Sequence, residues 1–268
     1  MRSILLHVYD DIGFESRLQA ALDLARTFDG HITCLHATPF EDYLAIDPIL
    51  ASALPETFST EMLHLRERLQ KKVEERLRVE GLPWDWVHRD ESIARALIRY
   101  SALSDVVVVS RAEDALYRDE PRPVVGPVAI SAGCPLLVIP PGLTRLHLER
   151  PMAIAWNGSP EVATALRAAL PLLELAPAVY LVEVQERRTP YPRDLAARYL
   201  SRHGIRPEII ERGDDGSVTQ ALKSAILEVG AGLMVMGAYG RSRLREAFFG
   251  GVTRDFLSDT EVPLLVAH

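Results

Sequence analysis

The stretch Leu233-Met-Val-Met-Gly-Ala-Tyr-Gly240 joins four apolar residues to a loop that opens on glycine. A short apolar run of this kind is typical of a buried parallel strand. The loop continues to Gly250-Gly-Val-Thr253, and Arg254-Asp-Phe-Leu257 then predicts a helix. Glycine lets a ligand approach the backbone, and a helix N-terminus presents unpaired N–H groups to an anion. The stretch therefore predicts a phosphate site, to which the arginines between Arg241 and Arg245 would add positive charge.

Length and charge exclude several classes of protein. The chain has 268 residues, a net charge of -7 and an isoelectric point near 5.7, which argues against a nucleic-acid binder or a protein of anionic membrane surfaces. No apolar run approaches the ~18 residues of a membrane helix. Asp10 and Asp11 end the apolar N-terminal run too early for a secretory signal. Cys34 and Cys134 stand in apolar surroundings and are expected to be free thiols. We expect a cytoplasmic protein without nucleic-acid or membrane partners.

The first half of the chain alternates strand patterns with helix patterns. Strands are predicted at Ile4–Tyr9, His31–Ala37, Trp84–His88, Val106–Val109 and Pro135–Ile139. Apolar residues at helical spacing predict helices at Phe14–Ala25, Met62–Leu77, Ile93–Leu103 and Pro123–Ala132. The pair Asp29-Gly30 ends the first helix.

The second half repeats this pattern. Strands are predicted at Met152–Trp156, Val179–Val184, Pro207–Glu211, Leu233–Met236 and Pro263–Ala267, and helices at Pro160–Leu175, Leu195–His203 and Ser217–Val229. The closing strands show the repeat directly, because Cys134-Pro-Leu-Leu-Val-Ile139 matches Val262-Pro-Leu-Leu-Val-Ala267. Ser159 is the expected N-cap of the helix that begins at Pro160, in which Pro171 would cause a kink or a weak point.

Strands that alternate with helices indicate an α/β fold with parallel sheets. We predict two tandem five-stranded, doubly wound, Rossmann-like domains of strand order 3-2-1-4-5, at residues 1–142 and 151–268, with a linker between them. In this order the switch point lies between the first and fourth strands, which end at Asn157 and Gly237 in the second half. The two halves are expected to pair through their closing strands as an intramolecular pseudo-dimer. Whole chains could form a further homodimer.

These residues resemble the nucleotide-binding members of the universal stress protein family. Their motif is Gly, two residues, Gly, nine residues, Gly and then Ser or Thr. Gly237, Gly240 and Gly250 stand at these spacings, and Gly251-Val-Thr253 stands where the family carries Ser-Val-Thr or a close relative. The resemblance covers nearly the whole chain as a tandem pair of family domains.

The resemblance implies that the second half binds an adenine nucleotide, with ATP as the expected ligand and Mg²⁺ as its companion. The adenine would lie near the ends of the first two strands and the phosphates on the glycine loop and the following helix. The implied nucleotide-binding residues are Asn157, Val184, Gly237, Gly240, Arg241, Gly250, Gly251, Val252 and Thr253. No catalytic residue and no protein metal ligand is predicted.

Two residues depart from the family pattern. Asn157 is neutral where the family often carries an aspartate, so it is a poorer partner for a ribose or a metal. Gly251 lacks the hydroxyl that would reach a phosphate, a loss of about 1 kcal/mol for one hydrogen bond. Thr253 or Ser242 could compensate for it.

The first half departs further and is expected not to bind nucleotide. Tyr9 stands at the aspartate position and Ser110 at the first glycine. Arg122-Pro123 replaces the two glycines at the helix start, and Pro123 removes a donor N–H. Other side chains in this loop are acidic and would repel phosphate: Glu113, Asp114, Asp119 and Glu120.

Two other functions stay open at this point. The glycine stretch could be a simple connection, in which case the protein would be an interaction module that responds to stress through protein partners. A slow ATP hydrolase is the second alternative. The Gly213–Ser217 segment predicts a turn rather than a calcium loop, and the scattered histidines do not predict a zinc site.

Overall fold

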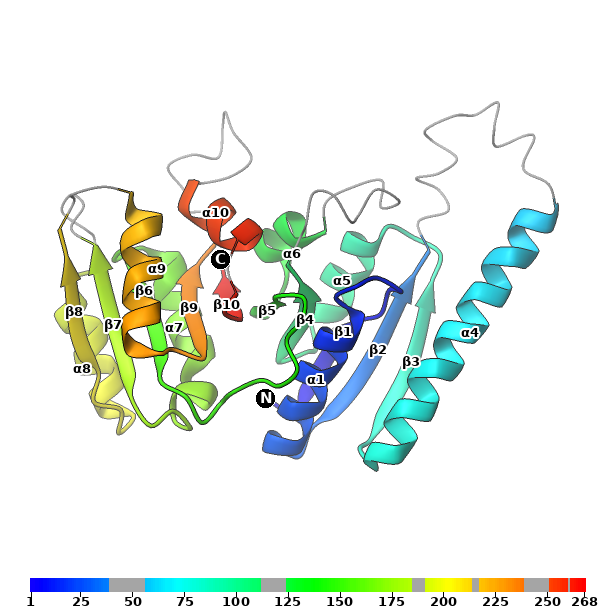
Figure 1. Ribbon diagram of the computed structural model, residues 1–268, viewed down its shortest axis with the longest axis horizontal. Coiled ribbons are helices and arrows are strands. Elements are labelled where there is room, and N and C mark those ends of the chain that lie inside the picture. Colours follow the sequence, from blue (N-terminus) through cyan, green and yellow to red (C-terminus); the bar gives the residue numbers. More distant parts are fainter. Residues whose placement is uncertain (39–55, 112–123, 185–190, 214–216, 239–250, 260) are drawn as a thin grey trace.

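The computed structural model describes residues 1–38, 56–111, 124–184, 191–213, 217–238, 251–259 and 261–268 (Figure 1). Ten strands form one sheet in the order β3-β2-β1-β4-β5-β10-β9-β6-β7-β8. Each half contributes five parallel strands in the order 3-2-1-4-5. The predicted α/β, doubly wound fold is therefore confirmed in both halves.

The strands coincide closely with the apolar runs of the sequence. Those of the first half are β1 (Ser3–His7), β2 (His31–Ala37), β3 (Trp84–Arg89), β4 (Val106–Ser110) and β5 (Leu136–Ile139). Those of the second half are β6 (Met152–Trp156), β7 (Val179–Val184), β8 (Glu208–Arg212), β9 (Leu233–Gly237) and β10 (Leu264–Ala267). The central strands are rich in β-branched or other apolar residues because both faces of a parallel sheet are covered.

Helices cover both faces of the sheet. The described helices are α1 (Phe14–Phe28), α4 (Glu56–Glu80), α5 (Ile93–Ser101), α6 (Val125–Ser131), α7 (Pro160–Leu173), α8 (Arg193–Arg202), α9 (Val218–Val229) and α10 (Gly251–Asp259). One buried cluster contains residues of α1, α4, α7 and α8, and the other contains residues of α5, α6, α9 and α10. Figure 1 shows α1 and α4 in front of the first half's strands, with α4 running past the edge of the sheet.

Local signals fix most of the helix ends. Ser159 caps α7 as predicted, since its hydroxyl accepts a hydrogen bond from the Val162 N–H at 3.2 Å. Asp29 ends α1 in the left-handed conformation with a φ of 50°. Ser217 stands at the N-cap of α9, but its hydroxyl makes no capping hydrogen bond with the described residues. α7 ends two residues after Pro171, which lies inside it.

The helix α4 is longer than the sequence predicts. Its apolar stripe begins only near Met62, yet the helix begins at Glu56. The preceding turns contain residues such as Glu56 and Glu61, which favour helix by intrinsic propensity. Periodicity of apolar residues therefore located this helix from Met62 onward and missed its start.

The two halves meet at their closing strands. β5 and β10 pair antiparallel, with Leu137 opposite Leu265 and Val138 opposite Leu264. The pairing closes the open edge of each five-stranded sheet, so that the ten strands become one continuous sheet. The predicted pairing of the halves through Pro135–Ile139 and Pro263–Ala267 is confirmed.

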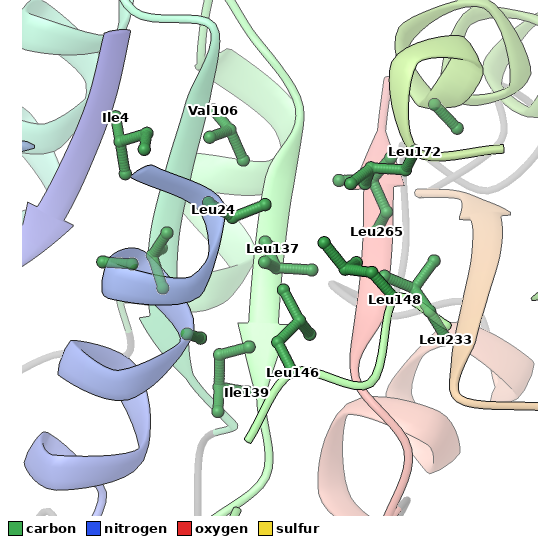
Figure 2. Packing of buried hydrophobic residues seen from close by; sticks show 14 of the residues in the cluster. Ile4, Leu24, Val106, Leu137, Ile139, Leu146, Leu148, Leu172, Leu233 and Leu265 are labelled. Carbon is green, nitrogen blue, oxygen red and sulfur yellow. The ribbon is translucent and has the colours of Figure 1, made fainter. Parts of the chain in front are cut away.

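The segment that connects the halves is part of the core. Leu146 and Leu148 are 2% and 8% exposed and pack between β5 on one side and β9 and β10 on the other, near Leu137 and Leu265 (Figure 2). The Leu146 N–H also donates to the Asp23 carboxylate at 2.8 Å. The connection therefore stabilises the seam as well as joining the halves.

Among the described residues, no helix is long and apolar enough to cross a lipid bilayer. Cys34 and Cys134 are both free thiols. Burial raises the pKa of each to about 12, so neither thiol ionises readily.

Candidate functional site at the switch point

The switch point of the second half lies where β6 and β9 end side by side. Ala155 of β6 pairs with Met236 of β9, so Asn157 and Gly237 follow at the same edge of the sheet. The Asn157 side chain is exposed, and its Oδ1 accepts a hydrogen bond from the Ser159 N–H at 3.1 Å. Its carbonyl oxygen thus orders the turn that starts α7, which leaves the amide NH₂ group as its donor toward a ligand.

Gly237 is required by the packing of this edge. A Cβ atom at this position would lie 2.6 Å from the Val162 nitrogen and 2.9 Å from the Glu161 carbonyl carbon. Both atoms belong to the backbone of the first turn of α7 and cannot move aside cheaply. The sequence predicts that this glycine lets a ligand approach the backbone, whereas the structure places the backbone of α7 against it.

The first half has the same close contact between the strand end and the helix start, but there the glycine is on the helix side. The offset of 148 residues that relates Ile4 to Met152 relates Gly13 to Glu161, and the offset of 127 that relates Val106 to Leu233 relates Ser110 to Gly237. A Cβ atom on Gly13 would lie 2.2 Å from the Ser110 Oγ. In each half one of the two contacting positions is glycine, at the helix start in the first half and at the strand end in the second.

The helix α10 carries the predicted phosphate-binding residues that the structure describes. Gly251 is its first residue, Val252 is half-buried, and Thr253 is 7% exposed. Because α10 lies in the chain between the parallel strands β9 and β10, we expect its N-terminus at the edge where β9 ends. The helix N-terminus there presents backbone N–H groups that can bind an anion.

Contacts with α9 hold α10 in place. The Thr219 hydroxyl donates to the Asp255 carboxylate at 2.8 Å, and Lys223 forms an ion pair with Asp259 at the other end of the helix. The Phe256 side chain between them is fully buried. The middle and the C-terminal end of α10 are therefore held against α9.

The predicted site residues are only partly described. Gly240, Arg241 and Gly250 lie outside the described residues. Val184 is the last residue of β7 and is half-buried. Because β7 pairs with β6, Val184 lies at the same edge of the sheet as Asn157. The structure thus brings Asn157, Val184 and Gly237 to one edge, with α10 following from it.

The edge beside Val184 is held by polar contacts that the sequence did not reveal. Arg193, the first residue of α8, pairs with Glu183 of β7 at 2.9 Å and also with Glu211 of β8. The Trp156 indole N–H donates to the Tyr191 carbonyl at 3.1 Å. These contacts fix the start of α8 above the ends of β6, β7 and β8, where the resemblance places an adenine.

A buried arginine fills the switch point of the first half. The Arg17 side chain is 0% exposed, and its Nη1 lies 2.9 Å from both oxygens of Asp11 and 2.6 Å from the Ser110 Oγ. Its Nε and Nη2 donate to the carbonyls of His7 and Tyr9 at 3.0 and 2.9 Å. The guanidinium therefore joins the ends of β1 and β4. The N–H groups that make these hydrogen bonds are not free to bind a ligand.

Histidines line the rest of this edge in the first half. His36 of β2 and His88 of β3 face each other with their Nδ1 atoms 3.0 Å apart, and His88 Nε2 lies 2.9 Å from the Asp90 carboxylate. Burial, followed by the neighbouring His88, lowers the pKa of His36 to about 4. Burial, followed by the charge of Arg17, holds the pKa of His7 well below its usual range. His7 and His36 are therefore neutral near pH 7 and do not attract an anion.

The part of the chain that the structure describes contains no group of three or more His, Cys, Asp or Glu residues arranged to hold a metal ion. A pocket of about 500 Å³ opens at the seam between Arg111, Pro141 and Asp259. It lies at the C-terminal end of α10 and so does not belong to the switch point.

Comparison with known proteins supports this architecture. No protein-family model matches the sequence, and no curated protein does. Among solved structures, the chain is similar to a universal stress protein from Archaeoglobus fulgidus, with a TM-score of 0.77 and 15% identity over 99% of this chain and 96% of that one. It is also similar to a putative universal stress protein from Pseudomonas aeruginosa, with a TM-score of 0.59 and 17% identity over 100% and 93% of the two chains.

A further similar structure is a functionally unknown protein from Pseudomonas aeruginosa, with a TM-score of 0.60 and 15% identity over 100% of this chain and 92% of that one. These full-length matches show that the chain has the universal stress protein fold in a tandem form. The resemblance seen in the sequence is confirmed at the level of the fold.

Proposed function

We propose that this chain is a tandem universal stress protein that binds one adenine nucleotide, ATP being the first to test, at the switch point of its second half. In this proposal the adenine lies along the edge from Asn157 to Val184. The phosphates lie on the segment from Gly237 to Gly251 and on the N-terminus of α10. Mg²⁺ accompanies the phosphates.

The observation that carries the proposal is the difference between the two switch points. The positions of Arg17 and Ser110 in the first half correspond to Ala165 and Gly237 in the second, by the offsets that relate the two sheets. In the first half, the Arg17 guanidinium makes five hydrogen bonds to polar groups at this edge of the sheet. The second half has no such guanidinium at that position, which favours a single ligand site there.

The helix start supports the phosphate end of the site. α10 is held against α9 by contacts of Thr219 and Lys223, and the N–H groups of its first turn are of the kind that bind an anion. Gly251 at its first position has no side chain, and the Thr253 hydroxyl is one candidate for the missing serine contact. The glycine spacing of 237, 240 and 250 supports the same place from the sequence.

We further propose that the protein acts in the cytoplasm in a regulatory or stress-protective role rather than as a metabolic enzyme. A role of this kind follows from the family resemblance and needs ligand binding without rapid turnover. Slow hydrolysis of ATP would be measured as phosphate release with Mg²⁺. Multiple turnovers per minute would favour the hydrolase alternative.

The test begins with the full chain purified from its expression host. Any nucleotide it carries is released by denaturation and identified by mass spectrometry, and calorimetry then compares ATP, ADP and AMP. We expect an adenine nucleotide and measurable heat of binding. A protein that carries no nucleotide and gives no heat at millimolar ligand would instead be a ligand-free interaction module.

Two matched variants locate the site. Gly240→Val alters the glycine motif of the second half, and Glu113→Val alters the aligned position of the first half. We expect Gly240→Val to abolish binding and Glu113→Val to leave it unchanged. Equal effects of the two substitutions would contradict a site confined to the second half.

A further inference from the structure

The strand β8 is an edge of the sheet. Among the described strands it pairs only with β7, so alternate residues direct their backbone N–H and C=O groups away from the sheet. Three of its five side chains are exposed: Glu208, Ile209 and Glu211. At the other end of the sheet, β3 is flanked by α4, which has 25 residues and runs past that edge, whereas α8 has only ten (Figure 1). β8 therefore offers hydrogen-bonding groups and exposed side chains to a partner strand.

The side chains of β8 divide between the two faces of the sheet, because alternate residues of a strand share a face. Arg212 forms an ion pair with α9, and Ile210 packs against the cluster that contains α9 residues. Glu208 lies on the same face by this alternation. Glu211 forms an ion pair with α8, so Ile209, 43% exposed, lies on the other face. The α9 face of the strand thus carries a negative, an apolar and a positive side chain in order.

This order is complementary to itself when two copies of the strand run antiparallel. Around a two-fold axis at Ile210, Glu208 of each copy lies opposite Arg212 of the other copy. The two Ile210 side chains lie opposite each other. Opposite charges and apolar side chains directly across an antiparallel ladder stabilise it. A single symmetric contact therefore supplies two ion pairs and one apolar pair.

The other antiparallel registers place like charges together. A two-fold axis perpendicular to the sheet keeps each face on its own side, so it must pass through a residue position of the strand. An axis at any of the three charged residues of β8 would place that residue opposite its own copy. An axis at Ile209 would place Arg212 opposite Arg206 of the other copy. Like charges directly opposite each other are destabilising, which leaves the axis at Ile210.

We propose that two copies of the chain pair through β8 as antiparallel strands about a two-fold axis at Ile210. The sheets of the two copies then form one continuous sheet. The contact repeats between chains what β5 and β10 do between the halves, where two closing strands pair antiparallel. The inference specifies the surface of a homodimer and does not depend on the nucleotide site.

The first test uses the natural full-length protein. Sedimentation equilibrium over a concentration series, at low ionic strength, measures the average mass in solution. We expect the mass to rise with concentration from the 29.8 kDa of one chain toward that of two. Added salt should weaken the dimer, because it screens the exposed ion pairs. A single chain at every concentration would overturn the inference.

The second test exchanges the charges of the proposed pairs. Glu208→Arg and Arg212→Glu each place like charges at both cross-strand pairs. We expect each substitution alone to raise the dissociation constant of the dimer about tenfold or more. In an equal mixture the two variants carry opposite charges at both pairs, so the mixture should dimerise within about threefold of the natural affinity. Dimers unaffected by either substitution, or a mixture that stays monomeric, would contradict the proposed register.

Glu174→Arg and Arg167→Glu are the matched controls. Each reverses one exposed charge in or next to α7, away from β8. We expect both controls to dimerise as the natural protein does, and equal effects of the controls would mean that net charge alone governs association. Because Arg212→Glu also breaks the ion pair with Glu228, circular dichroism verifies its fold. If Arg212→Glu does not fold, cysteine cross-linking decides.

Cross-linking locates the two-fold axis. Ile210→Cys places two thiols directly opposite each other, with Cβ atoms about 4.5–5.5 Å apart, close to the separation of a disulfide. The natural Cys34 and Cys134 do not compete, because burial raises the pKa of each thiol to about 12. Val87→Cys, at a half-buried position of β3, is the control. Under mild oxidation we expect a covalent dimer of Ile210→Cys only. A dimer formed equally or only by Val87→Cys would overturn the inference.

Discussion

Replacing Arg17 by methionine tests whether a guanidinium holds the first half together. The substitution keeps most of the side-chain volume and removes the charge and all five donors. Asp11, with its side chain 9% exposed, would lose the guanidinium while keeping the hydrogen bond from the Gly13 N–H at 2.7 Å. The carbonyls of His7 and Tyr9 would also lose a donor. Removing one partner of a buried ion pair costs about 3–5 kcal/mol, and we expect a loss in this range.

The assay is a urea titration of the full chain followed by tryptophan fluorescence. Trp84 and Trp86 both lie in β3 of the first half and report its unfolding. Arg167→Met, an exposed arginine of α7, is the matched control and should change the free energy of unfolding by less than about 0.5 kcal/mol. A loss below about 1 kcal/mol for Arg17→Met would refute the argument, because it would mean that the guanidinium is not needed at this switch point.

Further predictions concern the strand end, the neutral histidine and the seam. Gly237→Ala should lower the free energy of unfolding by about 1–3 kcal/mol, measured by urea titration, because its Cβ would meet the Val162 nitrogen at 2.6 Å. His36 is protonated in the unfolded chain below pH 6.5 but in the folded chain only near 4, so its stabilising contribution is present above pH 6.5 and lost as the pH falls toward 4. In titrations over this range, His36→Gln should therefore lose less stability than the natural protein, by up to about 1.4 kcal/mol per pH unit. Leu265→Ala should cost about 2–5 kcal/mol and, since Leu265 pairs with Leu137, should shift the unfolding of both halves together in calorimetric scans.

The sequence predicted the framework because its signals are local. Runs such as Val106–Val109 and Leu233–Met236 mark the strands, and their repeated order determines the doubly wound topology. The pairing of the halves followed from the matching closing strands, since each would otherwise leave an open edge. The hydroxyl of Ser159 caps the start of α7, and the left-handed Asp29 ends α1, both where the sequence placed them.

The contents of the two switch points could not be predicted in the same way. Arg17 looks like an ordinary charged residue on an amphipathic helix, and its contact with Ser110 spans 93 positions of the chain. Glu161 is a common residue type for a first helical turn, and only the fold shows that it is buried. Leu146 and Leu148 lie in a short, mostly polar stretch whose packing depends on the antiparallel seam.

Gly237 shows how one residue can satisfy two explanations. From the sequence it belongs to a glycine motif that resembles a nucleotide loop, and in the structure its missing Cβ makes room for the backbone of α7. The packing explanation would hold without a ligand. Support for a nucleotide site therefore rests more on the N-terminus of α10 and on the difference between the switch points than on this glycine.

We propose that the second half of the chain binds a nucleotide and that the first half does not. Native mass spectrometry of the full-length protein, incubated with ATP and Mg²⁺ in increasing amounts, measures this directly as the number of nucleotides bound per chain. We predict saturation at one nucleotide per chain. Saturation at two per chain would contradict the assignment of Arg17 as an internal substitute for a ligand, and no bound nucleotide at any concentration would contradict the site itself.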